Sequence, residues 1–186
     1  MPPVVVFVGA PGAGKSTIAA EVAKRLGLTH LDTDTLVEQH SGLTVSDIFV
    51  AEGEAAFRKR ERAAVEQALG TVETVLSLGG GAILDAETRT DLASQRVAWL
   101  QVSLTDAATR AGLNQARPLL LGNVRATLAK LLDERTPLYA AVADQQFDTS
   151  THTAHEVVEE VLAWLHSEPH SGSERLVTSE DSQAAS

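Results

Sequence analysis

The stretch GAPGAGKST, residues 9–17, decides the fold because it matches the pattern G-x-x-x-x-G-K-[ST]. The fixed positions of that pattern are occupied by Gly9, Gly14, Lys15 and Ser16. A β-branched and aromatic run at residues 4–8 precedes the stretch, and an apolar helical stripe at residues 16–26 follows it. In a strand–loop–helix unit of this kind, backbone N–H groups and the helix N-terminus bind phosphate, whereas a turn that binds nothing needs no such context. The stretch therefore predicts a site for ATP or GTP.

Outside this loop, strand-like and helix-like segments alternate along the chain, which is typical of an α/β fold with a parallel sheet. The strands are predicted at residues 4–8, 28–31, 74–78, 96–103 and 146–149. The helices are predicted at residues 16–26, 33–40, 44–52, 54–69, 86–94, 105–111, 124–135, 137–143 and 154–166. The pattern indicates one doubly wound, five-stranded sheet.

Composition narrows the class of protein further. The chain has 186 residues, 44% of them hydrophobic, which suits one folded domain. A net charge of −10 without a basic tract disfavours nucleic-acid partners, and the apolar run at residues 4–8 is too short to cross a membrane. The absence of cysteine fits a cytoplasmic enzyme.

The domain is expected to cover residues 1–166, followed by a disordered, Ser- and Glu-rich tail at residues 167–186. Within the domain, residues 112–123 have glycine at positions 112 and 122, with Arg117 between them. This pattern predicts a mobile lid that closes over the nucleotide, although an ordinary loop with one exposed charge has the same pattern.

Two aspartates follow the second predicted strand in the segment LDTD, residues 31–34. Strand alternation would point Asp32 and Asp34 the same way at the carboxyl edge of the sheet, where ligands bind in open α/β folds. Asp32 then suits an outer-sphere Mg²⁺ ligand, and Asp34 suits a group that orients or deprotonates a substrate hydroxyl. Helix capping is the alternative role, and both roles can coexist.

Several arginines and a glycine triplet complete the candidate site. Arg58, between Glu54 and Glu61 on a predicted helix, fits either a solvated charged face or an anion site. Arg135 precedes the segment TPLY. The triplet Gly79, Gly80 and Gly81 ends the third predicted strand and would let a ligand approach the backbone closely.

The ordered set GAPGAGKST, LDTD, GEAAFR (53–58), SLGGGA (77–82), RPLL (117–120) and RTPLY (135–139) resembles the shikimate kinase family over nearly the whole chain to about residue 166. The resemblance implies a P-loop NTPase fold of the nucleoside-monophosphate-kinase type. It also implies transfer of the γ-phosphoryl group of ATP to the 3-hydroxyl of shikimate, with Mg²⁺ as cofactor, in a monomeric cytoplasmic enzyme of aromatic amino acid biosynthesis.

The same resemblance assigns roles to individual residues. ATP binding is implied for Gly12, Ala13, Gly14, Lys15, Ser16, Thr17, Arg110 and Arg117. Shikimate binding is implied for Asp34, Arg58, Gly79, Gly80, Gly81 and Arg135. Mg²⁺ is implied at Ser16 and Asp32, and catalysis at Lys15, Asp34 and Arg117.

Two other functions are considered. A gluconate or nucleotide kinase would share the fold, but a nucleotide kinase is expected to carry a D-G-[FY]-P-R-like segment where this chain has Gly-Gly-Gly-Ala at residues 79–82. A ligand-sensing module of a regulator would need an effector domain, and the tail at residues 167–186 is too short to form one.

Overall fold

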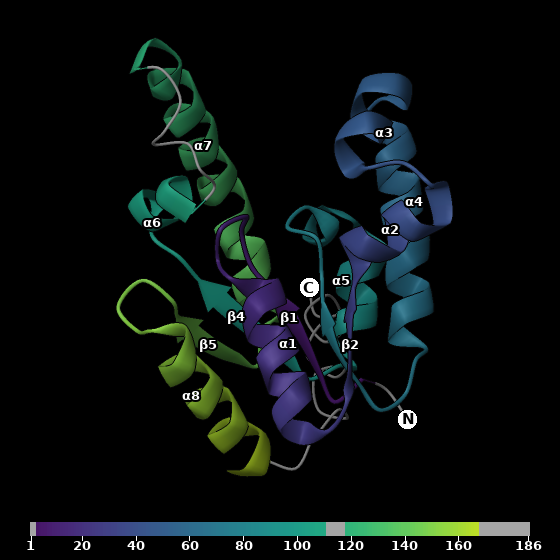
Figure 1. The fold of residues 1–186 in the computed structure, drawn as a ribbon, viewed down its shortest axis with the longest axis vertical. Coiled ribbons are helices and arrows are strands. Elements are labelled where there is room, and N and C mark those ends of the chain that lie inside the picture. Colours follow the sequence, from purple (N-terminus) through teal and green to yellow (C-terminus); the bar gives the residue numbers. More distant parts are fainter. Residues whose placement is uncertain (1–2, 111–117, 168–186) are drawn as a thin grey trace, which may run out of the picture.

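The computed structural model describes residues 3–110 and 118–167, and side chains in the second range from residue 125. Its centre is a five-stranded sheet in the order β2-β3-β1-β4-β5 (Figure 1). The strands are β1 (Val5–Val8), β2 (Thr29–Asp32), β3 (Thr74–Ser77), β4 (Val97–Gln101) and β5 (Gln145–Asp148). All neighbouring strands run parallel, so the five predicted strands and the predicted fold class are confirmed.

The helices alternate with the strands as the sequence indicates. They are α1 (Lys15–Leu26), α2 (Thr33–Ser41), α3 (Val45–Glu52), α4 (Glu54–Leu69), α5 (Ala86–Leu92), α6 (Leu104–Arg110), α7 (Pro118–Val142) and α8 (Ala154–Ser167), with a short 3₁₀ turn at η1 (Ala82–Leu84). In Figure 1, α2–α4 and α6–α7 form two projections on either side of the carboxyl ends of the strands. None of the helices in the described ranges has the length and apolarity required to span a bilayer.

Strand β1 lies at the centre of the sheet and is almost completely buried. Each residue of Val5–Val8 is at most 2% exposed, because β1 pairs with β3 on one side and β4 on the other while helices cover both faces. A strand covered on both faces must be apolar throughout, which is the pattern seen in its sequence. Helix α1 packs against α8 on one face, and its buried residues include Ile18 and Val22.

One predicted boundary is wrong. The sequence suggested a loop to residue 123 and then two helices separated before Pro137, whereas α7 is a single helix from Pro118 to Val142. Proline inside a helix removes one backbone hydrogen bond. Contacts on both sides of Pro137 hold the helix together: Arg135 and Tyr139 each donate a hydrogen bond to the Gly80 carbonyl. Tertiary contacts thus override the local preference.

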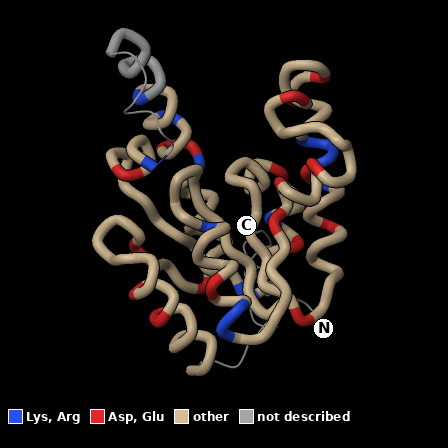
Figure 2. The backbone as a smooth tube through the Cα atoms, viewed as in Figure 1, with Lys and Arg blue, Asp and Glu red and all other residues tan. Residues whose placement is uncertain are grey.

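Positive and negative residues are mixed along the described part of the chain. Figure 2 shows Lys and Arg interspersed among Asp and Glu along the described part of the backbone. The predicted tail at residues 167–186 lies outside the described residues except for Ser167, which ends α8. The predicted lid lies outside them for residues 112–117.

Candidate functional site

The phosphate-binding loop joins β1 to α1, as the motif predicts. Gly14 caps the N-terminus of α1 in a left-handed conformation, and Lys15 is the first helical residue. The Lys15 ammonium folds back over the loop and donates hydrogen bonds to the carbonyls of Gly9 (2.8 Å) and Ala10 (3.1 Å). Burial lowers the pKa of Lys15 to about 8, against the opposing charges of Asp34 and Asp32.

Asp32 ends β2 and is held by four hydrogen bonds. Its Oδ2 accepts from the hydroxyls of Ser77 (2.6 Å) and Ser16 (2.7 Å), and its Oδ1 accepts from the backbone N–H groups of Asp34 and Thr35. Burial alone would raise the pKa of this carboxyl, but the hydrogen bonds outweigh burial and hold the pKa below its usual range. Asp32 therefore caps α2 and also lies beside the phosphate-binding loop.

The element that carries Asp34 differs from the predicted one. Asp34 belongs to the first turn of α2, not to the strand, so strand alternation is the wrong reason for its direction. Its Oδ1 lies so close to Gly79 that a Cβ added there would be 2.4 Å away. Burial and the charge of Asp32 raise the pKa of Asp34, while the charge of Lys15 opposes the rise.

The glycine triplet packs against the charged side chains themselves. A Cβ on Gly79 would meet Asp34 and Glu61, and a Cβ on Gly81 would lie 2.1 Å from a guanidinium nitrogen of Arg58. Side chains at these two positions would displace the carboxylates and the guanidinium. The turn after β3 thus allows two acidic groups and one basic group to lie against bare backbone.

Arg58 is held by two carboxylates on its own helix. It donates to Glu61 Oε2 at 2.6 Å and to Glu54 Oε1 at 3.1 Å. Glu61 is 3% exposed, so this pair is not the solvated surface pair that the helical spacing also permitted. Burial raises the pKa of Glu61, and Arg58 opposes the rise.

Arg135 and Tyr139 meet the middle of the triplet from α7. The Arg135 guanidinium (2.9 Å) and the Tyr139 hydroxyl (2.6 Å) both donate to the Gly80 carbonyl. Burial raises the pKa of Tyr139 to about 12, so this hydroxyl stays protonated and can donate. The predicted acceptor residues Asp34, Arg58 and Arg135 therefore meet at one turn.

Of the two arginines predicted to bind the nucleotide, Arg110 and Arg117, only Arg110 is among the described residues. Arg110, at the end of α6, donates to the carbonyl of Gly12 (3.3 Å) and to the hydroxyl of Thr149 (3.1 Å). It links the phosphate-binding loop to the segment after β5. Arg117, predicted for the lid, lies outside the described residues.

Three residues of this site were not singled out from the sequence: Glu61, Ser77 and Tyr139. Glu61 carried a detectable signal, since it falls in phase with the buried residues Phe57, Ala64, Val65 and Ala68 of α4. A carboxylate on an apolar stripe needs a partner, and Arg58 supplies it. Ser77 and Tyr139 lie within the segments SLGGGA and RTPLY, but their residue types alone indicate no role, because a buried serine or tyrosine fits any core.

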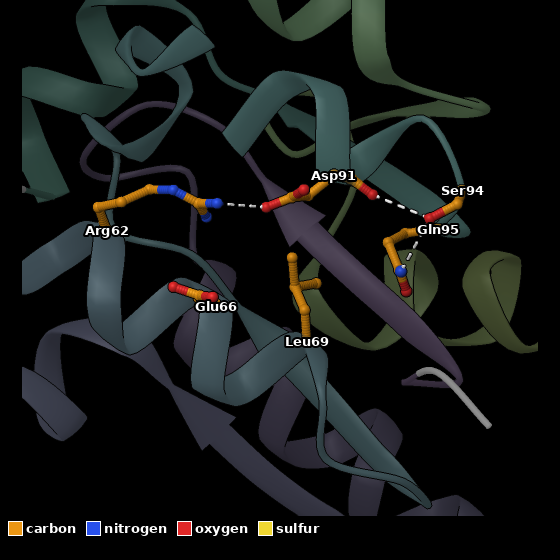
Figure 3. Close-up of a pocket in the computed structure, with 6 residues that line it drawn as sticks. All are labelled: Arg62, Glu66, Leu69, Asp91, Ser94 and Gln95. Carbon is orange, nitrogen blue, oxygen red and sulfur yellow. Dashed lines mark hydrogen bonds and ion pairs between the residues drawn. The ribbon is translucent and has the colours of Figure 1, made fainter. Parts of the chain in front are cut away.

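A separate pocket lies between α4 and α5, away from these residues. Arg62, Glu66 and Leu69 line it from α4, and Asp91, Ser94 and Gln95 line it from α5 and the following turn, around about 270 Å³ (Figure 3). Arg62 donates across it to Asp91 at 2.7 Å. None of the residues predicted for the site lies in this pocket.

The geometry at the sheet edge suits phosphoryl transfer. A lysine, a glycine-rich loop and a helix N-terminus can bind phosphates, while Asp34, Arg58 and Arg135 surround the adjoining turn with groups that recognise hydroxyl and carboxylate. The hydroxyl of Ser16 next to the carboxylate of Asp32 offers the hard oxygen ligands that Mg²⁺ prefers. The described residues contain no cluster of three or more His, Cys, Asp or Glu that could bind a metal alone. That is compatible with Mg²⁺, which takes few protein ligands and several from substrate phosphates and water.

Comparisons of the sequence and of the structure with known proteins point to the same family over most of the chain. A family model described as shikimate kinase matches residues 11–166. A shikimate kinase of Thermobifida fusca (strain YX) is 53% identical over 157 residues, which cover 84% of this chain and 91% of that protein. A solved shikimate kinase from Acinetobacter baumannii, in complex with shikimate, is 34% identical with a TM-score of 0.82 and covers 90% of this chain and 94% of its own. A gluconokinase from Sinorhizobium meliloti 1021 shares the fold at a TM-score of 0.56 and 20% identity, covering 89% and 92% of the two chains.

Proposed function

We propose that this chain, which belongs to the shikimate kinase family, transfers the γ-phosphoryl group of ATP to the 3-hydroxyl of shikimate at the turn formed by Gly79, Gly80 and Gly81. One observation carries this assignment. The turn is contacted by Asp34 from α2, by Arg58 from α4 and by Arg135 from α7, beside the loop that contains Lys15. Three acceptor-binding groups thus adjoin a phosphate-binding loop.

Each acceptor residue has a role that follows from its chemistry. Arg58 and Arg135 bind the carboxylate of shikimate, because a guanidinium pairs with a planar carboxylate through two parallel hydrogen bonds. Asp34 accepts a hydrogen bond from the 3-hydroxyl and orients its oxygen toward the γ-phosphorus. Its raised pKa makes it a better proton acceptor than an ordinary aspartate. Gly79, Gly80 and Gly81 let the ring approach the backbone.

Residues of the loop bind the triphosphate of ATP. Backbone N–H groups of Gly12, Ala13, Gly14, Lys15, Ser16 and Thr17 surround the phosphates, and the Lys15 ammonium leaves its carbonyl partners to neutralise the outer ones. Ser16 and Asp32 hold Mg²⁺, Asp32 through its hydrogen bond with Ser16. When bound, Mg²⁺ neutralises charge that develops on the phosphate oxygens. Arg110 lies where the adenine is expected, and Arg117 closes with a lid at residues 112–123 and excludes water.

We also propose an oligomeric state, a location and a set of partners, on the basis of the family and the composition. The protein acts as a monomer in the cytoplasm on two small molecules, without nucleic-acid or membrane partners. Sedimentation with and without both substrates tests the monomeric state directly.

The proposal is tested by measuring ADP release with Mg·ATP and a panel of acceptors: shikimate, quinate, gluconate and nucleoside monophosphates. We expect saturable turnover with shikimate. Turnover with gluconate and none with shikimate would overturn the assignment in favour of the second kinase class. ATP hydrolysis that no acceptor stimulates would contradict both.

A further inference from the structure

A chain of hydrogen bonds leads from Asp32 to a histidine that has no assigned role. Asp32 Oδ2 accepts from the Ser77 hydroxyl at 2.6 Å, and Ser77 Oγ lies 2.9 Å from Nε2 of His30. Ser77 is fully buried, and the pairing of β2 with β3 places it directly opposite Asp32. His30 and Asp32 are two residues apart on β2 and share one face of the sheet.

Counting protons gives this chain a direction. A serine hydroxyl has one proton, and an ionised carboxylate can only accept. Asp32 accepts two hydrogen bonds at each of its carboxyl oxygens, which is the pattern of an ionised carboxylate, so the Ser77 proton is committed to Asp32. The contact between Ser77 and His30 can then be a hydrogen bond only if Nε2 of His30 carries the proton and donates it.

We propose that His30 is a positioning residue for Asp32: its Nε2–H donates to Ser77, which fixes the serine hydroxyl so that its proton points at the carboxylate. A serine hydroxyl rotates freely unless its lone pairs are engaged, and a donor on the far side removes that freedom. The catalytic meaning of this role rests on the proposed function. The direction of the chain does not, since it is a property of the protein without ligands.

The surroundings support a fixed tautomer of His30. The ring is half-buried, and its Nε2 lies 2.9 Å from Ser77 Oγ. Asp32 Oδ2 also accepts a hydrogen bond from the Ser16 hydroxyl. This one oxygen therefore accepts from Ser77 on β3 and from Ser16 on α1. Hydrogen-bond partners behind a metal-binding group typically change metal affinity by about 10- to 100-fold. Asp32 is such a partner behind Ser16, and His30 acts two hydrogen bonds further away, through Ser77, so a smaller effect is expected.

The first test reads the tautomer directly. Long-range ¹H–¹⁵N correlation spectra of the protein without ligands at about pH 8, above the ordinary histidine pKa of about 6.5, should show His30 protonated at Nε2 and not at Nδ1. The Nδ1–H tautomer would overturn the proposal. This result is independent of turnover, so it separates failure of the inference from failure of the proposed function.

The second test measures Mn²⁺ binding to the enzyme–ADP complex by electron paramagnetic resonance, without turnover. We expect H30L to weaken Mn²⁺ affinity about 3- to 10-fold. H30Q should restore affinity to within about 2-fold of the parent protein, because the glutamine amide nitrogen reaches the position of Nε2 and is a donor. S77A should be at least as damaging as H30L.

A double-mutant cycle separates positioning from a general loss of packing. If His30 acts through Ser77, H30L should have no further effect on Mn²⁺ affinity in the S77A background. H40L, at an exposed histidine near the end of α2, is the matched control and should leave Mn²⁺ affinity unchanged. Additive effects of H30L and S77A, or an H30L variant that binds Mn²⁺ as the parent does, would refute the role.

Discussion

Arg58 and Arg62 lie one turn apart on α4, and each is bound by several carboxylates, yet they belong to different kinds of cluster. The nearest partner of Arg58 is Glu61, which is 3% exposed and lies at the glycine turn. The nearest partner of Arg62 is Asp91, which is 39% exposed, and its further partners Asp85 and Glu87 are 44% and 81% exposed. Similar sequence patterns therefore place one arginine in the candidate site and the other in a cluster of ion pairs between α4 and α5. We call this cluster, formed by Arg62, Asp85, Glu87 and Asp91, the clamp. The difference lies in the exposure of the nearest acid, since the second partner of Arg58, Glu54, is also exposed.

The largest expected difference between the clusters concerns their aspartates. Asp34→Asn removes the group proposed to orient the acceptor hydroxyl, so kcat should fall by about 100- to 10,000-fold while ATP still binds. Asp91→Asn, in the clamp, should change kcat by less than about 2-fold. Steady-state kinetics and equilibrium ATP titration of both variants test this. An Asp34→Asn enzyme that keeps most of its kcat contradicts the role of Asp34.

The two arginines themselves give the next largest contrast. Arg58→Lys keeps the charge but loses the bidentate fork, so KM for shikimate should rise about 10- to 100-fold with KM for ATP little changed. Arg62→Lys is the matched substitution one turn away and should leave both KM values within about 2-fold. Equal effects of the two variants on KM for shikimate would mean that α4 as a whole, not Arg58, sets the acceptor site.

The free energy of unfolding should rise when Lys15 of the candidate site is replaced and fall when Arg62 is replaced. Because the pKa of Lys15 falls from 10.5 to about 8 on folding, the folded state bears a cost for its charge below about pH 8, and the cost disappears above pH 10.5. Lys15→Met should therefore raise the free energy of unfolding at pH 7 by about 1–3 kcal/mol, and the gain should vanish near pH 10.5. Urea unfolding at both values of pH measures it. A loss of stability at pH 7 would contradict the cost assigned to the buried ammonium.

The smallest expected effect is that of the clamp on stability. Arg62→Met removes ion pairs with partly exposed acids, so the free energy of unfolding should fall by only about 0.5–1 kcal/mol. Salt should screen those pairs, and the difference from the parent protein should shrink between about 0.1 and 1 M NaCl. A larger loss that salt does not change would point to packing of the arginine stem instead.

The fold, and the placement of most candidate residues at one sheet edge, could be predicted from the sequence because those features depend on local patterns. The phosphate-binding loop, the apolar strands and the cap at Asp32 follow from neighbouring residues. Asp34 was assigned to the correct sheet edge for the wrong reason, since a helix turn and not a strand directs it.

What could not be predicted depends on contacts between distant residues. Helix α7 continues through Pro137, and residues on both sides of that proline bind the carbonyl of Gly80, which is remote in sequence. The buried state of Glu61 depends on how α4 packs against the turn after β3. The link from His30 to Asp32 depends on the register of β2 with β3. Local periodicity contains none of this information.

The contact between α7 and the glycine turn has a consequence for mutational robustness. Arg135 and Tyr139 both bind the carbonyl oxygen of Gly80, and every amino acid at position 80 would supply that oxygen. The lack of a side chain there answers a separate demand, since a Cβ would lie 2.9 Å from the ring of Pro11. The hydrogen bonds of this junction can therefore lose either donor on α7 while the other persists. Substitution of Gly80 keeps the acceptor oxygen but meets the separate obstacle of the Pro11 ring.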